Sequence, residues 1–313
     1  MKASSTQQEF LNRMTGHIIE AANIAAVPYD KDLVRDILDA YGDFFSRSAV
    51  TFVTNTRSDG ERTLSVRYVD CRHPHDPVAI ARTNGFIVPN GDPVHRFLDE
   101  FRSQYPLSGY GVDLEVNRGL TKIWAFLQTP RPVEEFFSMK SLPDSARGHK
   151  DYFFRHRLHF VSHFALDYYH QSTNIYFMIR RPGQATTGKM EKMVGELGLE
   201  IPERPLLDYC KYAVTIYPTF NWQSRHAERL CMGMAASAPQ QVPTHLHPLL
   251  ESFTSDVPVL SPERGFIYGV TPGRKGLYIK IANDYTGTMI KMMMERSQAI
   301  PEERNDGMGT NNI

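Results

Sequence analysis

The 313-residue sequence has little of what marks several large classes of protein. It contains three cysteines, Cys71, Cys210 and Cys231, an odd number that favours free thiols in a reducing compartment over a disulfide framework. Its 35 basic and 35 acidic residues cancel, so the chain lacks the positive footprint of a nucleic-acid-binding protein. No stretch approaches ~18 uninterrupted apolar residues and no apolar leader opens the chain. We therefore expect a cytoplasmic protein without a membrane span or signal peptide.

What the sequence does have is a repeat. Five polar residues, four of them cations, recur at intervals of 55, 52, 55 and 51 residues: Arg67, Lys122, Asn174, Arg229 and Lys280. Each falls on the second strand of a predicted hairpin, and a period of this length indicates one supersecondary unit used five times. Buried cations that face a shared interior are costly unless an anion or water fills that interior. The repeat therefore predicts a closed barrel that holds an anionic ligand.

The repeating unit is predicted to be two helices followed by a hairpin. Apolar residues at helical spacing predict helices at 7–26, 30–46, 76–84, 93–104, 133–139, 144–156, 186–198, 203–207, 243–253 and 286–298. Alternating residues predict strands at 49–54, 64–70, 111–117, 120–127, 159–167, 173–180, 209–217, 227–235, 265–271 and 276–282. We expect an α+β fold: one domain over residues 1–300, forming a ten-stranded antiparallel barrel surrounded by helices and built from five ααββ repeats. Residues 301–313 are polar and are expected to be a disordered tail.

Alternation along the strands separates two faces. One face is apolar, with residues such as Val66, Ile123 and Ile281, and must meet the helices. The other face mixes the repeating polar residues with large aromatic side chains such as Trp124 and Tyr176. An open sheet with this second face in water is the alternative, but aromatic rings beside cations suit an enclosed ligand chamber better.

Such a chamber suits an allylic diphosphate. Lysine and arginine side chains bind phosphate oxygens, and aromatic faces attract cations by roughly 0.5–2 kcal/mol each. The cationic donors would stabilise the departing diphosphate while the rings shield the carbocation. A closed barrel would also exclude the water that quenches this cation.

Short segments in a fixed order strengthen this interpretation. They are residues 119–124 (GLTKIW), 174–177 (NIYF), 197–202 (LGLEIP), 209–211 (YCK), 215–222 (TIYPTFNW), 229–231 (RLC), 276–280 (GLYIK) and 285–287 (YTG). Together they resemble the soluble aromatic prenyltransferases of the ABBA, or prenyltransferase-barrel, family over roughly residues 10–298.

The resemblance implies transfer of a prenyl group from an allylic diphosphate to an electron-rich aromatic compound, and it implies roles for individual residues. Diphosphate binding falls to Lys122, Asn174, Tyr217, Arg229 and Lys280, with Arg67 helping to balance charge. The catalytic set is Lys122, Tyr217, Arg229 and Lys280. The prenyl chain contacts Trp124 and Tyr176. The aromatic acceptor contacts Phe52, Arg67, Ser162, Val214, Thr215, Gly233 and Asp284.

Two departures from the family pattern refine the expectation. Ser65 stands where some members hold magnesium with an aspartate, as it does in the aminocoumarin-type branch, so we expect turnover without metal or other cofactor. Ala282 stands where that branch has a glutamate for its keto-acid substrate, which argues against 4-hydroxyphenylpyruvate. Hydroxynaphthalenes, phenazines or phenols are the expected acceptors. Bulky Trp124 favours the five-carbon dimethylallyl donor, with geranyl diphosphate left open.

Other interpretations remain at this point. A barrel that binds a phosphorylated or aromatic small molecule without catalysis would have the same composition. Residues 183–190 nearly match a phosphate-binding loop, but Met190 replaces the Ser or Thr that would ligate magnesium. Residues 71–76 collect metal-ligand types without a second paired half, which favours a solvated connector. A closed barrel leaves no free strand edge, so we expect a monomer.

Overall fold

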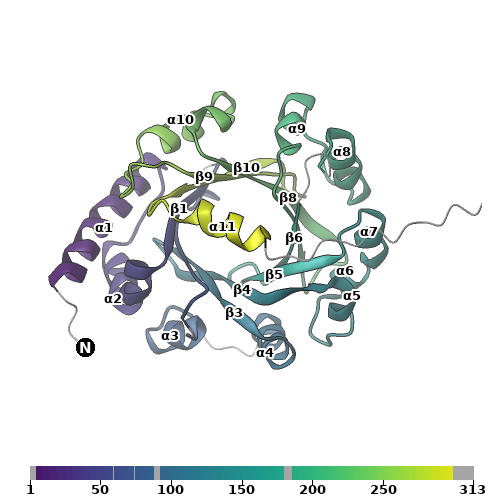
Figure 1. The fold of residues 1–313 in the computed structure, drawn as a ribbon, viewed down its shortest axis with the longest axis horizontal. Helices are drawn as coiled ribbons and strands as arrows, with labels where there is room; N and C mark the ends of the chain where they lie inside the picture. The colour runs from purple at the N-terminus through teal and green to yellow at the C-terminus, as the bar shows by residue number, and fades with distance from the viewer. Residues whose placement is uncertain (1–4, 59, 74, 88–91, 180–184, 299–313) are drawn as a thin grey trace, which may run out of the picture.

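The computed structural model describes residues 5–58, 60–73, 75–87, 92–179 and 185–298. Its strands close into one barrel, and a ring of helices surrounds it (Figure 1). The strands are β1 (Ala49–Asn55), β2 (Ser65–Asp70), β3 (Leu107–Glu115), β4 (Gly119–Pro132), β5 (Phe160–Asp167), β6 (Ser172–Met178), β7 (Thr215–Asn221), β8 (Ala227–Ala236), β9 (Phe266–Thr271) and β10 (Tyr278–Asp284). The helices are α1 (Ser5–Ile24), α2 (Lys31–Arg47), α3 (Pro77–Thr83), α4 (Pro93–Gln104), α5 (Val133–Phe136), α6 (Asp144–Arg147), α7 (Lys150–Arg155), α8 (Thr187–Glu196), α9 (Arg204–Cys210), α10 (Pro248–Ser255) and α11 (Met289–Gln298), with 3-10 helices η1 (Pro239–Gln241) and η2 (Thr244–Leu246).

Every strand pairs antiparallel with its neighbour in the chain, and β1 pairs with β10 to close the barrel. In the closing pair Thr51 lies opposite Asp284, and Asn55 lies opposite Lys280. Antiparallel pairing throughout gathers the five hairpin turns at one end of the barrel and the helical connections at the other. We call these the hairpin end and the α11 end. The predicted ten-stranded antiparallel barrel is confirmed.

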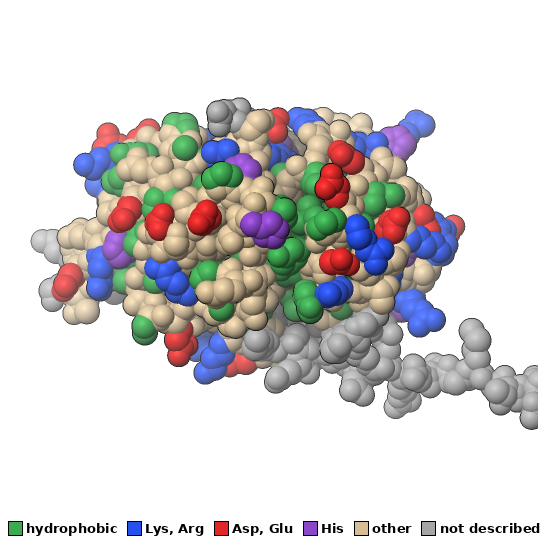
Figure 2. Space-filling model, turned by 90° about the horizontal axis from the view of Figure 1, so that it is seen from above, with side chains coloured by type: hydrophobic (Ala, Val, Ile, Leu, Met, Phe, Trp, Pro, Cys, Tyr) green, Lys and Arg blue, Asp and Glu red, His purple; other side chains and the backbone are tan. Residues whose placement is uncertain are grey.

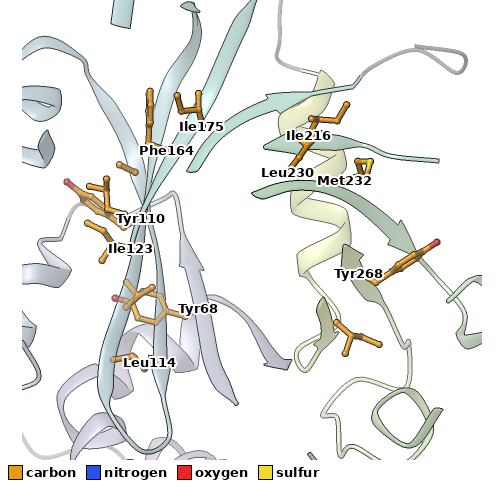
Figure 3. Close-up of a cluster of buried hydrophobic side chains, with 14 of the residues drawn as sticks. Tyr68, Tyr110, Leu114, Ile123, Phe164, Ile175, Ile216, Leu230, Met232 and Tyr268 are labelled. Carbon is orange, nitrogen blue, oxygen red and sulfur yellow. The ribbon is translucent and has the colours of Figure 1, made fainter. Parts of the chain in front are cut away.

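The main hydrophobic core lies between the strands and the surrounding helices. Alternate residues of each strand supply it, as the labelled side chains from Tyr68 on β2 to Tyr268 on β9 illustrate (Figure 3). The helices pack their apolar faces against these residues. On α2, for example, Ile37, Tyr41 and Phe45 are buried. Because the outward strand face is apolar, the inward face is free to carry polar residues.

The last helix, α11, lies across the middle of the ring of strands instead of outside it (Figure 1). Asp284 at the end of β10 fixes its start, accepting hydrogen bonds from the backbone N–H groups of Gly287 at 2.9 Å and Met289 at 2.8 Å. A carboxylate at a helix N-terminus satisfies orphan donors and favours the helix dipole. Met289, Met292 and Met293 consequently line the barrel interior.

Several predicted elements differ in their bounds from the structure, and three of them show the physical causes. The strand expected at 209–217 begins only at Thr215, because residues 204–210 form α9 with buried residues at helical spacing. The helix expected at 144–156 is two short helices, α6 and α7, separated at Gly148–His149. The helix expected at 243–253 starts at Pro248, a residue suited to a first helical turn. The predicted tail, residues 301–313, lies outside the described residues.

The surface carries both signs of charge. On the face drawn in Figure 2, acidic and basic side chains are interspersed, in keeping with the zero net charge of the chain. Among the described residues, no helix combines the length and the apolar character needed to cross a lipid bilayer.

Phe52, expected to contact the aromatic acceptor, lies on the wrong face for that role. It pairs with Val66 on β2 and so shares the outward face, while Val53 and Ser65 point into the barrel. The Phe52 ring is fully buried and stacks on Tyr285 with ring centroids 4.6 Å apart. A one-residue shift along a strand exchanges the two faces, which explains the error.

Phe52→Ala should therefore destabilise the fold, and it should do so by removing packing outside the barrel. We expect a loss of about 3–5 kcal/mol in the free energy of unfolding, measured in urea, as for other buried aromatic truncations. Val53→Ala is the matched control on the inward face and should cost about 1 kcal/mol or less. Equal losses at the two positions would contradict the assigned faces.

Candidate active site

The barrel encloses a cavity of about 470 Å³, a size typical of small-molecule sites. Toward the hairpin end its lining includes Arg57, Glu61, Glu115, Arg118, Lys122, Asp167, His170, Arg229, Lys275, Tyr278 and Lys280. Toward the α11 end it includes Val69, Phe126, Ser162, His163, Met178, Thr215, Gly233, Ile267, Tyr268, Ala282, Met289, Met292 and Met293. The cavity therefore joins a charged compartment to an apolar compartment.

Ion pairs account for most of the charge in this cavity. Four lining carboxylates each have a cationic partner: Arg67–Asp113 at 2.5 Å, Lys122–Asp167 at 3.3 Å, Arg118–Glu115 at 3.1 Å and Arg57–Glu61 at 3.6 Å. Three lining cations, Arg229, Lys275 and Lys280, have no carboxylate partner within 4.0 Å in the described part of the chain. The cavity thus has an excess of positive charge that would complement a multiply charged anion.

Burial acts against the positive charge of both Arg229 and Lys280, although Tyr278 and Asp167 outweigh it at Arg229 and raise the pKa of that guanidinium. The Arg229 Nε atom is buried without a hydrogen-bond partner among the described residues. Burial lowers the pKa of Lys280 most strongly; Tyr278 opposes this effect, while Arg229 and Lys122 add to it, and the pKa falls to about 8. A bound anion would satisfy the orphan donor and restore the lysine charge.

Tyr278 stands among these cations. The Arg57 guanidinium carbon lies 4.1 Å from the centroid of the Tyr278 ring, and the Lys280 Nζ atom lies 5.7 Å from it. Burial by itself would raise the pKa of the Tyr278 hydroxyl, but the charges of Arg229, Lys280 and Arg57 outweigh it and lower that pKa below its usual value.

The carboxylates of the charged compartment are not equivalent. Asp167 accepts a hydrogen bond from the His170 backbone at 2.8 Å and faces Lys122, and these contacts hold its pKa well below the usual range despite burial. Burial raises the pKa of Glu115 to about 7. The nearby Asp167 and Asp113 charges also raise this pKa, whereas the Arg118 charge lowers it. Glu115 is therefore close to half-protonated near neutral pH, which reduces repulsion of an incoming anion.

An aromatic wall separates the two compartments: His163, Tyr176, Tyr217 and Trp124. The Tyr176 ring stacks on His163 at 4.0 Å and on Tyr217 at 4.1 Å between centroids, and Trp124 lies 5.8 Å from Tyr176. Ring faces of this kind carry negative quadrupoles. The Lys280 Nζ atom lies 5.7 Å from the centroid of the Tyr217 ring, so the aromatic wall directly adjoins the unpaired cations.

Arg67 supports this wall more than it supplies free positive charge. Asp113 binds it in a bidentate manner, with a 2.9 Å contact from Nη2, and its guanidinium carbon lies 3.8 Å from the Trp124 ring centroid. The planar guanidinium is thus neutralised on one edge and stacked on an indole on its face. In this structure Arg67 holds Trp124 in position, and its expected share in diphosphate binding stays a prediction.

Most of the residues expected at the site do line the cavity. They are Arg67, Lys122, Trp124, Ser162, Tyr176, Thr215, Tyr217, Arg229, Gly233 and Lys280. Gly233 is tightly enclosed, since a Cβ atom there would lie 2.7 Å from the Thr215 methyl carbon. These residues come from β2, β4, β5, β6, β7, β8 and β10, so the closed barrel is what brings them together.

Three further expected residues, besides Phe52, do not line the cavity. Asn174 is buried on the same strand face as Tyr176, where its Oδ1 accepts from Thr219 at 2.8 Å and its Nδ2 donates to the Tyr176 hydroxyl at 3.3 Å. Val214 precedes β7 on the outward alternation shared with Ile216. Asp284 is occupied with the start of α11. In this structure these three residues make structural contacts, and their expected ligand contacts stay predictions.

Sequence reasoning missed several lining residues. Asp113 and Asp167 lie on first strands of hairpins, directly opposite Arg67 and Lys122 on the preceding hairpins, so the register between successive hairpins is what reveals these pairs. Tyr278 lies two residues before Lys280 on the same strand face, which was a visible signal. The approach of α11 to the cavity had no local signal, because it depends on tertiary packing.

The other candidate motifs gain no support. In the part of the chain that the structure describes, no group of three or more His, Cys, Asp or Glu side chains is arranged to hold a metal ion. Within residues 71–76, Asp76 is engaged by Arg102 through contacts of 3.0 Å. The phosphate-loop match begins among residues 180–184, which lie outside the described residues.

Comparison with known proteins identifies the class. The family model described as aromatic prenyltransferase Orf2 matches residues 10–296, and the chain belongs to this family. It is an enzyme of the prenyl-transferring type, which favours catalysis over simple binding in the barrel.

Named relatives agree with this assignment. The chain is 28% identical to the 5,10-dihydrophenazine-1-carboxylate 9-dimethylallyltransferase of Streptomyces anulatus, covering 87% of this chain and 92% of the relative. It is 26% identical to the flaviolin linalyltransferase of Streptomyces virginiae, covering 85% and 89% respectively. The solved structure of a 5-dimethylallyl tryptophan synthase from Streptomyces coelicolor shares the fold, with a TM-score of 0.55 at 11% identity over 93% of this chain and 96% of that one.

Anion binding in the charged compartment should depend on pH through Lys280. Its lowered pKa of about 8 means that the free enzyme loses this positive charge as pH rises through that value. Ionisation of Tyr278 would add a negative charge in the same direction. We expect the affinity for inorganic pyrophosphate to fall as the pH rises through the Lys280 pKa of about 8. Calorimetry from about pH 6.5 to about pH 9.5, a range that brackets the pKa of about 8, measures this change. Lys280→Arg should retain more affinity at high pH, because arginine stays charged. Flat affinity in the unmodified protein would contradict the role of Lys280.

Proposed function

We propose that this enzyme transfers a dimethylallyl group from dimethylallyl diphosphate to a flat, electron-rich aromatic acceptor, through an allylic cation and without a metal ion. The observation that carries the proposal is the direct contact between two features of one enclosed cavity. Cations without carboxylate partners occupy its hairpin end, and a wall of aromatic rings begins beside them.

The charged compartment suits the diphosphate. Arg229 and Lys280 are half-buried and find no carboxylate within 4.0 Å among the described residues, so phosphate oxygens would be strong partners for both. Lys122 is tied to Asp167 in the free enzyme at 3.3 Å and can share its three ammonium protons with a ligand. Donors placed in advance around the leaving group stabilise the charge that develops as the C–O bond breaks.

The aromatic wall suits the cation that remains. Tyr176, Tyr217 and Trp124 present ring faces next to the diphosphate position, and such faces stabilise a nearby cation by roughly 0.5–2 kcal/mol each. Trp124 is further held in place by Arg67. Its bulk across the middle of the cavity supports a five-carbon donor over a longer one, and geranyl diphosphate is the comparison that tests this.

The apolar compartment suits the acceptor. Among its described lining residues there is no Lys, Arg, Asp or Glu, and its polar groups are hydroxyls, the His163 ring and the Gln128 amide. Burial of a carboxylate there would be costly. Ala282 lines this compartment as well, so no carboxylate is present at that position to recognise a keto acid. Hydroxynaphthalenes, phenazines and phenols without a charged group are the acceptors that this lining supports.

The donor set supports turnover without metal. Ser65 lines the cavity in place of a carboxylate, and each lining carboxylate is already engaged by a cation. Lys280, Arg229 and Lys122 would supply the positive charge that magnesium supplies elsewhere. The closed barrel supports a monomeric enzyme, and the three free cysteines support a reducing, cytoplasmic setting.

The direct test incubates the purified protein with dimethylallyl diphosphate and a panel of uncharged hydroxynaphthalenes, phenazines and phenols in EDTA, with product detected by mass spectrometry. We expect a product heavier by one dimethylallyl group. Product only after magnesium is added would overturn metal independence alone. Absence of product with every donor and acceptor, with and without magnesium, would overturn the transfer reaction.

Substitution of the cations proposed to bind the diphosphate should lower turnover much more than it lowers stability. Arg229→Ala and Lys280→Ala each remove a donor placed against the departing charge, and we expect turnover to fall by about 10²–10³-fold. Lys275→Ala is the matched control, since Lys275 is an exposed cation on the rim of the same compartment, and its loss should have a smaller effect. Thermal unfolding of each variant separates catalysis from folding. Near-normal turnover in both buried-site variants would contradict the diphosphate position.

A further inference from the structure

The hydroxyl of Tyr278 is a group of the charged compartment that the proposed chemistry has not used. Tyr278 begins β10, with its ring buried in the cavity wall and only 6% of the residue exposed. Strand alternation puts it on the same inward face as Lys280, two residues later. The bridge between Arg229 and Gly273 brings β8 against the turn that leads into Tyr278.

Cations surround this ring on several sides. Arg57, from the hairpin between β1 and β2, stacks over it at 4.1 Å, and Lys280 lies 5.7 Å from its centroid. Arg229 is its strongest electrostatic partner, and Cys231 is the neighbour that acts in the opposite sense. Within the described residues, no hydrogen bond engages the Tyr278 hydroxyl. Tyr278 lines the cavity together with Arg57, Arg229 and Lys280, so its hydroxyl belongs to the compartment proposed to hold the diphosphate.

The other two tyrosines near the diphosphate position differ. Tyr176 and Tyr217 stack on each other, and burial raises the pKa of both hydroxyls. The Tyr176 hydroxyl also accepts a hydrogen bond from Asn174. These phenols hold their protons firmly, whereas the cations around Tyr278 lower its pKa. Only Tyr278 combines an available hydroxyl with surroundings that stabilise the phenolate.

We propose that Tyr278 is a catalytic residue that donates its proton to the departing diphosphate. This inference rests on the proposed prenyl transfer and adds a general acid to it. Without a metal, the leaving oxygen must be neutralised by protein groups, and proton transfer does this more completely than a fixed charge.

The step balances in atoms and electrons. The bond between the allylic C1 and the diphosphate oxygen breaks, and its electron pair stays on that oxygen, which takes the proton of Tyr278. The aromatic carbon attacks the allylic cation and then loses its own proton, which leaves to solvent. The Tyr278 phenolate, stabilised by Arg57, Arg229 and Lys280, regains a proton from solvent as the protonated diphosphate departs. The proton lost by the aromatic carbon thus balances the one that the diphosphate carries away, and the enzyme returns to its starting state.

The test compares Tyr278→Phe with the unmodified enzyme on two donors. Dimethylallyl methylenebisphosphonate has a more basic leaving group than dimethylallyl diphosphate, so it depends more on a proton donor. We expect Tyr278→Phe to lower kcat by about 10²–10³-fold with the diphosphate, and by a larger factor with the methylenebisphosphonate. Binding of inorganic pyrophosphate should change little, because the ring that Arg57 stacks on remains. Tyr110→Phe, whose hydroxyl contacts Arg102 outside the barrel at 2.8 Å, is the control.

The outcomes are separable. If the unmodified enzyme forms no prenylated product, the proposed function fails. If it does, but Tyr278→Phe keeps its kcat or loses the same factor with both donors, the general-acid role is overturned and the residue is structural. Should Tyr278→Phe fail to fold, 3-fluorotyrosine at position 278 preserves the side-chain size with a more acidic hydroxyl. It should move the alkaline decline of kcat to lower pH, and an unchanged decline would overturn the proposal.

Discussion

Charge compensation inside a closed barrel is the constraint on which the rest of this structure depends. The outward strand faces are committed to the helices, so the polar residues must point inward, where water is scarce. Three buried carboxylates, Asp113, Glu115 and Asp167, would be prohibitive alone; they and the exposed Glu61 are each paired with a cation within 3.6 Å. Only after this pairing does a small positive excess remain at Arg229 and Lys280. The charge of a ligand that suits the cavity is thus set by the positive charge that the carboxylates leave uncompensated.

The same compensation divides the cavity along its axis. Charged residues collect at the hairpin end, where short turns can carry Arg57, Arg118 and Lys275 beside solvent. The opposite end is closed by α11, whose methionines are flexible and apolar. Between them the Arg67–Asp113 pair serves the aromatic wall, because it fixes Trp124 without adding net charge. A donor that is anionic at one end and hydrocarbon at the other can align with this gradient in only one direction.

Much of the fold could be predicted because the repeat is visible in the sequence. The 51- to 55-residue period and the two-residue alternation identify the hairpins and the inward face without any long-range information. The errors have definite physical causes. Phe52 was assigned from a resemblance, and a shift of one residue exchanged its face. The strand predicted at 209–217 was placed too early, because three apolar residues of α9 are spaced as on a helix.

The site was predicted less completely, because partners across strands are invisible to a motif. Arg67 and Lys122 looked like free cations on their own strands. Register alone brings Asp113 and Asp167 opposite them and changes their roles. Asn174 shows the same effect, since Thr219 on β7 and Tyr176 occupy its amide.

Asp284 shows how a residue can matter to the acceptor without touching it. Its carboxylate accepts four backbone N–H groups at the start of α11, from Gly287 to Ile290. Burial still raises its pKa, so the helix start provides enough donors to hold the group in place but leaves it sensitive to protonation. Since Met289, Met292 and Met293 depend on this helix for their position, the shape of the apolar compartment is linked to a carboxylate outside it. Asp284, which aligns with an acceptor contact of the family, can therefore influence acceptor binding through α11, the helix that it anchors.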